Sequence, residues 1–122
     1  MRLLIADDSA ALRERLLEML SRLNGVDVVG QARDVAEALA AIRTLRPDAV
    51  ILDIRMPGGS GLDVLRELKR TRPSTVAIML THHAEYRQKC AELGADYFLP
   101  KVSASKDLMD VCMRVASEGR PS

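Results

Sequence analysis

The sequence predicts an α/β fold, a three-layer doubly wound sandwich whose middle layer is a five-stranded parallel sheet. Short continuous apolar runs, typical of strands buried on both faces, alternate with segments whose apolar residues recur at helical spacing. Five such strand-helix units follow one another, and this alternation favours right-handed crossovers with helices on both faces of the sheet. We expect a single domain, 1–122, large enough to bury its own core.

The first unit begins with the apolar run 3–6, which leads directly into Asp7 and Asp8. Ser9 is a suitable N-cap for the helix that follows, and Gly25 ends that helix. Its predicted inner face is a stripe of leucines: Leu12, Leu16, Leu20 and Leu23.

The second unit has a strand over 26–32, a helix capped by Asp34 and a stop at Pro47. The inner face of this helix consists of small and aliphatic residues: Val35, Ala38, Leu39 and Ile42. The third strand, 49–52, leads into Asp53, and a loop rich in glycine and proline over 56–61 follows it. Leucines then mark the inward side of the third helix: Leu62, Leu65 and Leu68.

The fourth strand, 76–80, leads into Thr81, and the fifth, 97–100, leads into Lys101. Between them we expect a shorter helix that Gly94 ends, with three inward residues: Tyr86, Cys90 and Leu93. The last helix has a similar apolar face: Leu108, Val111, Cys112 and Val115.

Composition excludes several classes of protein. The 18 basic and 17 acidic residues give a net charge of +1, with no separate basic block, so we expect no direct nucleic-acid binding. No apolar stretch reaches membrane-spanning length, and the N-terminal one is too short for a signal peptide, so we expect a soluble cytoplasmic protein that does not bind membranes. Cys90 and Cys112 have no metal-binding spacing and are interpreted as buried, reduced thiols.

The strand ends carry the chemistry. Because ligands bind outside the carboxyl ends of parallel strands, Asp7, Asp8 and Asp53 are expected to converge there. Three neighbouring carboxylates repel one another, and Mg²⁺ is the cation that best suits them, since it prefers oxygen ligands. Either Asp7 or Asp8 alone could be a helix cap, but capping does not explain all three acids.

The loop after Asp53 favours an accessible carboxylate. Pro57 can preset a turn, while Gly58, Gly59 and Gly61 allow the main chain to fold tightly beside the acid. We therefore expect Asp53 to be exposed at the edge of the sheet. Beside Mg²⁺ and a lysine, such a carboxylate is a competent nucleophile toward phosphorus.

These residues, at these intervals, resemble the receiver domain of two-component response regulators. The resemblance spans almost the whole chain and rests on linked positions: Asp7-Asp8, Asp53 within Asp-Ile-Arg-Met-Pro-Gly-Gly-Ser-Gly, Thr81, Phe98 and Lys101. It implies the strand order 2-1-3-4-5 of flavodoxin-like folds. It also implies phosphorelay signalling, with a sensor histidine kinase or a histidine phosphotransfer protein as the phosphodonor and a downstream protein as the target.

The resemblance further implies a role for each site residue. Asp53 would accept the phosphoryl group, and Asp8, Asp53 and the main-chain carbonyl of Arg55 would hold Mg²⁺ with assistance from Asp7. Lys101 would pair with a phosphoryl oxygen. The protein would assist its own phosphorylation and dephosphorylation without being an enzyme that acts on a separate substrate.

The resemblance also implies a switch. The Thr81 hydroxyl would bond a second phosphoryl oxygen, and Phe98 would rotate inward into the space it leaves. The surface formed by the fourth helix, the fifth strand and the fifth helix would then change. Ordinary strand positions for Thr81 and Phe98 are the alternative.

The chain departs from the family pattern at two places. Val102 follows Lys101 where many relatives have proline, and we expect the bond between them to be trans. His82 follows Thr81 where relatives commonly have a small residue, and we expect it either to narrow access to Asp53 or to be an ordinary exposed loop residue.

Two arrangements of the receiver remain open: a stand-alone switch, and a receiver excised from a larger regulator, for example one that binds DNA, with 119–122 as the start of a linker. Two other classes are disfavoured. A phosphotransfer enzyme for small molecules would need a second carboxylate two residues after Asp53, where Arg55 stands. A flavodoxin would need a phosphate-binding loop where Asp7 and Asp8 would repel the ligand.

Overall fold

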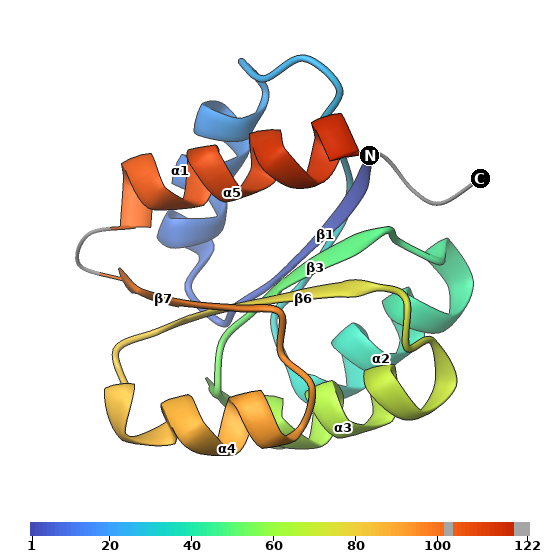
Figure 1. Cartoon of the computed structure of the whole chain (residues 1–122). Helices are drawn as coiled ribbons and strands as arrows, with labels where there is room; N and C mark the ends of the chain where they lie inside the picture. The colour runs from blue at the N-terminus through green and yellow to red at the C-terminus, as the bar shows by residue number, and fades with distance from the viewer. Residues whose placement is uncertain (102–103, 119–122) are drawn as a thin grey trace.

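The computed structural model describes residues 1–101 and 104–118 and shows a parallel sheet between two layers of helices (Figure 1). The main sheet has five strands: β1 (Arg2–Ala6), β2 (Asp27–Ala32), β3 (Ala49–Leu52), β6 (Val76–Thr81) and β7 (Tyr97–Pro100). Their order is β2-β1-β3-β6-β7, and every neighbouring pair is parallel. Since β6 and β7 are the fourth and fifth strands of this sheet, the predicted order and fold class are confirmed.

The helices divide between the two faces of the sheet. One face is covered by α1 (Ala10–Leu20) and α5 (Ala104–Glu118). The other face is covered by the remaining helical segments: α2 (Val35–Leu45), α3 (Gly61–Thr71), the 3₁₀ turn η1 (Ala84–Tyr86) and α4 (Arg87–Glu92). The short strands β4 (Arg55–Met56) and β5 (Gly59–Ser60) form a separate antiparallel ribbon.

Successive side chains along a strand point to opposite faces of the sheet, so the structure has two hydrophobic cores. In β1, Leu3 and Ile5 belong to the core under α1 and α5, while Leu4 and Ala6 belong to the core under α2, α3 and α4. All four are fully buried, and each leucine or isoleucine buried in this way contributes about 1.5–3 kcal/mol. The predicted inner faces of the helices pack into these two cores.

Side-chain caps begin the first two helices. The Leu12 amide donates to Ser9 Oγ at 3.2 Å, and the Glu37 amide donates to Asp34 Oδ1 at 2.8 Å. Glu37 Oε1 in turn accepts from the Arg33 amide at 2.9 Å, so two otherwise unpaired amides are satisfied. The two predicted N-caps are confirmed.

The first helix ends earlier than its leucine stripe predicts. The helix ends at Leu20, and Leu23 lies in the following turn, although it still packs against the core. The Leu23 amide donates to the Leu20 carbonyl at 3.1 Å and the Arg22 amide to the Met19 carbonyl at 3.3 Å. These bonds span three residues, so the chain tightens and leaves the α-helix before the last leucine of the stripe.

The remaining differences concern single segments. The second strand begins at Asp27 and not at Val26, and the loop predicted over 56–61 contains the β4-β5 ribbon. Both cysteines are buried and free, as predicted.

The predicted trans bond before Val102 and the predicted linker 119–122 lie outside the described residues. Within the described ranges, no helix is both long and apolar enough to cross a membrane.

Candidate functional site

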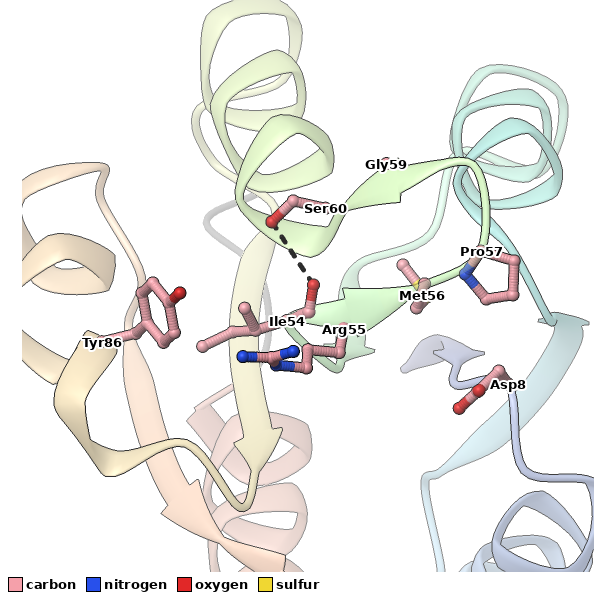
Figure 2. Close-up of a pocket in the computed structure, with 8 residues that line it drawn as sticks. All are labelled: Asp8, Ile54, Arg55, Met56, Pro57, Gly59, Ser60 and Tyr86. Atoms are coloured by element: carbon pink, nitrogen blue, oxygen red, sulfur yellow. Dashed lines mark hydrogen bonds between the residues drawn. The ribbon is translucent and has the colours of Figure 1, made fainter.

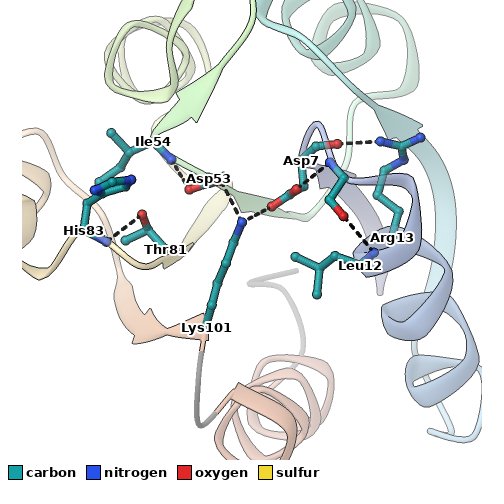
Figure 3. A network of polar contacts seen from close by, with 9 residues as sticks. Asp7, Leu12, Arg13, Asp53, Ile54, Thr81, His83 and Lys101 are labelled. Atoms are coloured by element: carbon teal, nitrogen blue, oxygen red, sulfur yellow. Dashed lines mark hydrogen bonds and ion pairs between the residues drawn. The ribbon is translucent and has the colours of Figure 1, made fainter.

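Residues from the carboxyl ends of separate strands meet at one edge of the sheet (Figure 3). Asp7 follows β1, Asp53 follows β3, Thr81 ends β6 and Lys101 follows β7. Parallel strand directions bring these positions together although they are far apart in the sequence. The predicted convergence is therefore present in the structure.

The Lys101 ammonium lies between two buried carboxylates. Its Nζ is 2.7 Å from Asp7 Oδ2 and 2.8 Å from Asp53 Oδ2. Burial by itself would lower the pKa of Lys101, but the hydrogen bonds to Asp53 and Asp7 and the charges of both acids outweigh it and raise the pKa above its usual value. Lys101 is thus held as a cation that neutralises part of the acidic cluster.

Asp53 is not exposed, contrary to the prediction. The residue is only 6% exposed, its Oδ2 is covered by the Lys101 ammonium, and its Oδ1 accepts from the Ile54 amide at 2.7 Å. The loop after Asp53 instead packs against the Asp53 main chain at Gly61, and Lys101 and the Ile54 amide cover the carboxylate. Both oxygens of Asp53 therefore have fixed partners, which orients the carboxylate.

The other two acids differ from each other. Asp7 is 2% exposed and its Oδ1 accepts from the Ser9 amide at 2.8 Å, while Asp8 is exposed to solvent. Asp7, Asp8 and Asp53 each offer a carboxylate oxygen within 4.8 Å of the others. Ser9 caps α1, so capping does not account for these acids. Their oxygen donors and spacing fit the ligand preferences of Mg²⁺.

Glycines allow the loop after Asp53 to pass close to it. Gly58 and Gly59 have φ angles of +86° and +147°, which residues with side chains adopt only with strain. At Gly61, a Cβ would lie 1.9 Å from the Asp53 carbonyl oxygen, so the position has no room for one. The Gly61 amide donates to the Ile54 carbonyl at 2.6 Å and closes the loop.

An open pocket of about 480 Å³ adjoins the acids (Figure 2). Its lining residues come from the segments that follow β1 and β3, from the ribbon and from η1: Asp8, Ile54, Arg55, Met56, Pro57, Gly59, Ser60 and Tyr86. The side chains of Arg55 and Asp8 both belong to this lining, one basic and one acidic. Asp8 is a member of the acidic cluster, so this pocket connects the cluster to solvent.

Thr81 lies on the side of Asp53 away from Asp7 (Figure 3). It is 1% exposed, and its Oγ1 accepts from the His83 amide at 3.2 Å. His82, the neighbouring residue, is exposed. The Thr81 hydroxyl is therefore close to the acid and already oriented by the following loop.

Two arginines that no sequence motif marks contact predicted site residues. The Arg87 guanidinium lies 4.8 Å from the centre of the half-buried Phe98 ring, a cation-π geometry. Arg13 Nη1 donates to the Asp7 carbonyl oxygen at 2.6 Å. Nothing in the local sequence marks either arginine, because each contact depends on how two separate elements pack.

A doubly wound parallel sheet with three carboxylates and a lysine at its carboxyl edge places the chain among flavodoxin-like α/β proteins. The model of the response regulator receiver domain matches residues 3–112. The chain therefore belongs to the response regulator receiver domain family, and it acts in phosphorelay signal transduction.

Individual relatives agree with this assignment. The chain is 38% identical, over 96% of its length and 34% of the relative's, to protein-glutamate methylesterase/protein-glutamine glutaminase 1 of Xanthomonas campestris pv. campestris. It is 41% identical to response regulator MprA of Mycobacterium avium, over 89% of this chain and 48% of MprA. The crystal structure of the response regulator domain of Thermotoga maritima CheB superposes with a TM-score of 0.86 at 27% identity, covering 99% of this chain and 98% of that one. The chain thus spans about a third to a half of the length of these two curated relatives.

Proposed function

We propose that Asp53 is the phosphoacceptor and that a phosphohistidine on a sensor histidine kinase or a histidine phosphotransfer protein is the donor. The observation that carries this proposal is the Lys101 ammonium, 2.8 Å from Asp53 Oδ2 within a cluster of three acids. A carboxylate next to a fixed cation can approach an anionic phosphoryl group, because the cation offsets the repulsion between them.

The transfer needs little covalent chemistry from the protein. An oxygen of Asp53 forms a bond to phosphorus while the phosphorus-nitrogen bond of the donor histidine breaks, and the imidazole leaves with the electron pair of that bond. Lys101 then shifts from the Asp53 carboxylate toward a phosphoryl oxygen. The fixed orientation of Asp53, from the Ile54 amide on one oxygen and Lys101 on the other, supports this role.

We further propose that Asp8, Asp53 and the main-chain carbonyl of Arg55 hold Mg²⁺, with assistance from Asp7. When bound, the ion supplies positive charge that neutralises the phosphoryl oxygens. Asp8 is the exposed member of the acidic cluster and lines the pocket together with Arg55, which leaves it accessible to an entering ion. Lys101 holds Asp7 and Asp53 in place before the ion enters.

The output of the domain is a conformational switch. The Thr81 hydroxyl turns toward a phosphoryl oxygen, and Phe98 moves inward into the space that Thr81 leaves. Phe98 is half-buried under the Arg87 guanidinium at the start of α4, so its movement alters the surface formed by α4, β7 and α5. A downstream protein that binds this surface would detect the phosphorylated state.

In this proposal the chain assists its own phosphorylation and dephosphorylation and has no separate substrate. We place it in the cytoplasm, where histidine kinases display their phosphohistidine, and the two free cysteines suit a reducing compartment. The alternative arrangement is a receiver domain within a larger regulator. It is supported by curated relatives that are longer than this chain. The length of the genomic reading frame distinguishes the two.

Mass spectrometry tests the phosphoacceptor directly. Incubation with Mg²⁺ and acetyl phosphate, or with a phosphorylated kinase, is expected to add one phosphoryl group to the wild type and none to Asp53→Asn. Asp63→Asn, at an exposed position on α3, is a matched control that keeps the label. A label that persists in Asp53→Asn would assign the acceptor to another residue.

A further inference from the structure

Arg13 makes two contacts that the proposed phosphoryl transfer does not use. From α1, its Nη1 donates to the Asp7 carbonyl oxygen at 2.6 Å (Figure 3), and its Nε donates to Gln31 Oε1 on β2 at 3.0 Å. One guanidinium therefore joins α1, the end of β1 and the edge strand β2. A planar guanidinium that donates to two partners in different directions has less freedom to move than one with a single partner.

The contact with Asp7 completes the fixation of that residue. The Asp7 amide donates to the Ala32 carbonyl at 2.9 Å, and the Asp7 carboxylate is bonded by the Ser9 amide and by Lys101. Arg13 adds a partner for the remaining polar group, the main-chain carbonyl. All polar groups of Asp7 thus have defined positions.

Holding the Asp7 carbonyl in place also orients the main-chain amide nitrogen of Asp8. The carbonyl of Asp7 and the amide nitrogen of Asp8 belong to one planar peptide unit, so holding one sets the orientation of the other. Asp8 is exposed, and among the described residues no hydrogen bond to its carboxylate is found. The peptide plane that Arg13 holds therefore limits the directions that the Asp8 side chain can take, together with the φ and χ1 angles of Asp8 itself.

We propose that Arg13 is a positioning residue that orients Asp8 for a divalent cation. This inference rests on the proposed function, since it assigns to Arg13 a part in building the same metal site. Arg13 does not touch the ion or the phosphoryl group; it acts through the peptide unit between Asp7 and Asp8. Residues that orient metal ligands typically affect metal affinity by about 10–100-fold.

Charge alone predicts the opposite effect. A guanidinium near three carboxylates repels a cation, so removing its charge would make Mg²⁺ bind more tightly if electrostatics were its only contribution. A positioning role predicts weaker binding when the same side chain is removed. The sign of the change therefore separates the two explanations.

The test is the dissociation constant of Mg²⁺, measured by NMR titration of the metal-free protein. We expect Arg13→Met to bind Mg²⁺ about tenfold more weakly than the wild type. Arg13→Lys, which keeps a charged donor, is expected to recover part of the affinity. The matched control is Arg15→Met, which removes the same charge from an exposed position on α1 and is expected to leave the affinity equal or slightly tighter.

Urea unfolding in EDTA accompanies each titration. A merely structural role would lower the free energy of unfolding of Arg13→Met and leave the Mg²⁺ affinity of its folded form unchanged, which would overturn the proposal. If Arg13→Met does not fold, Gln31→Met removes the second anchor of the guanidinium at an exposed position, and weaker Mg²⁺ binding is again expected. Unchanged or tighter binding in Gln31→Met would then overturn it.

The outcomes also separate this inference from the function on which it rests. If the wild type does not bind Mg²⁺, the proposed metal site fails and the role of Arg13 fails with it. If the wild type binds Mg²⁺ and is phosphorylated at Asp53, but Arg13→Met binds the ion as tightly, only the positioning role is refuted.

Discussion

Replacing Lys101 with Met in the metal-free protein removes the cation that lies between Asp7 and Asp53. The side chains of these acids are only 3% and 7% exposed, so two carboxylates would remain largely shielded from water without a cationic partner, each keeping one main-chain amide donor. At these separations each ion pair gains about 6 kcal/mol of attraction at an effective dielectric constant near 20, and desolvation offsets much of this. Removing one partner of a buried ion pair typically costs about 3–5 kcal/mol. We expect a loss of about 3 kcal/mol, since the neighbouring Asp8 side of the cluster is open to solvent.

Urea unfolding at pH 7 in EDTA measures this loss. Lys106→Met, at an exposed position on α5, is the matched control and is expected to change the free energy of unfolding by less than about 0.5 kcal/mol. Adding Asp7→Asn to Lys101→Met is expected to recover stability, because it removes one of the two unpaired charges. Saturating Mg²⁺ is expected to stabilise Lys101→Met by binding the folded state alone. The reasoning is refuted if Lys101→Met loses no more stability than Lys106→Met.

Three further predictions follow from local features of the fold. Gly61→Ala is expected to lower the free energy of unfolding by about 3 kcal/mol, because its Cβ would lie 1.9 Å from the Asp53 carbonyl oxygen; a loss below about 1 kcal/mol in urea unfolding would contradict this. Burial raises the pKa of the Cys112 thiol to about 12, so only the unfolded thiol ionises between about pH 9 and 12, and the free energy of unfolding falls by about 1.4 kcal/mol per pH unit there. In urea unfolding from pH 8.5 to 10.5, Cys112→Ala is therefore expected to lose stability less steeply with pH than the wild type. Equal slopes for the two proteins would contradict this prediction. Asp34→Ala is expected to cost about 1 kcal/mol by removing the acceptor of the Glu37 amide, whereas Asp34→Asn is expected to retain most of the stability, and equal losses in thermal unfolding would argue against capping.

Much of the fold could be read from the sequence because its signals are local. Apolar runs such as 49–52 and helical stripes depend only on near neighbours in the chain, and the caps at Ser9 and Asp34 use side chains within three residues of their partners. The end of α1 was misplaced because the leucine spacing continues to Leu23, while the hydrogen bonds tighten after Leu20.

The sequence alone determined the order of the main strands and helices, the apolar faces of the helices and the set of acids at the strand ends, because periodicity and strand direction place side chains without further information. Only the tertiary structure decided that Asp53 is buried beneath the Lys101 ammonium and that Arg13 holds the carbonyl of Asp7. These contacts join β3 to the end of β7 and α1 to the end of β1. Their geometry follows from the paths of loops and from the rotamers that packing selects, which no local pattern encodes.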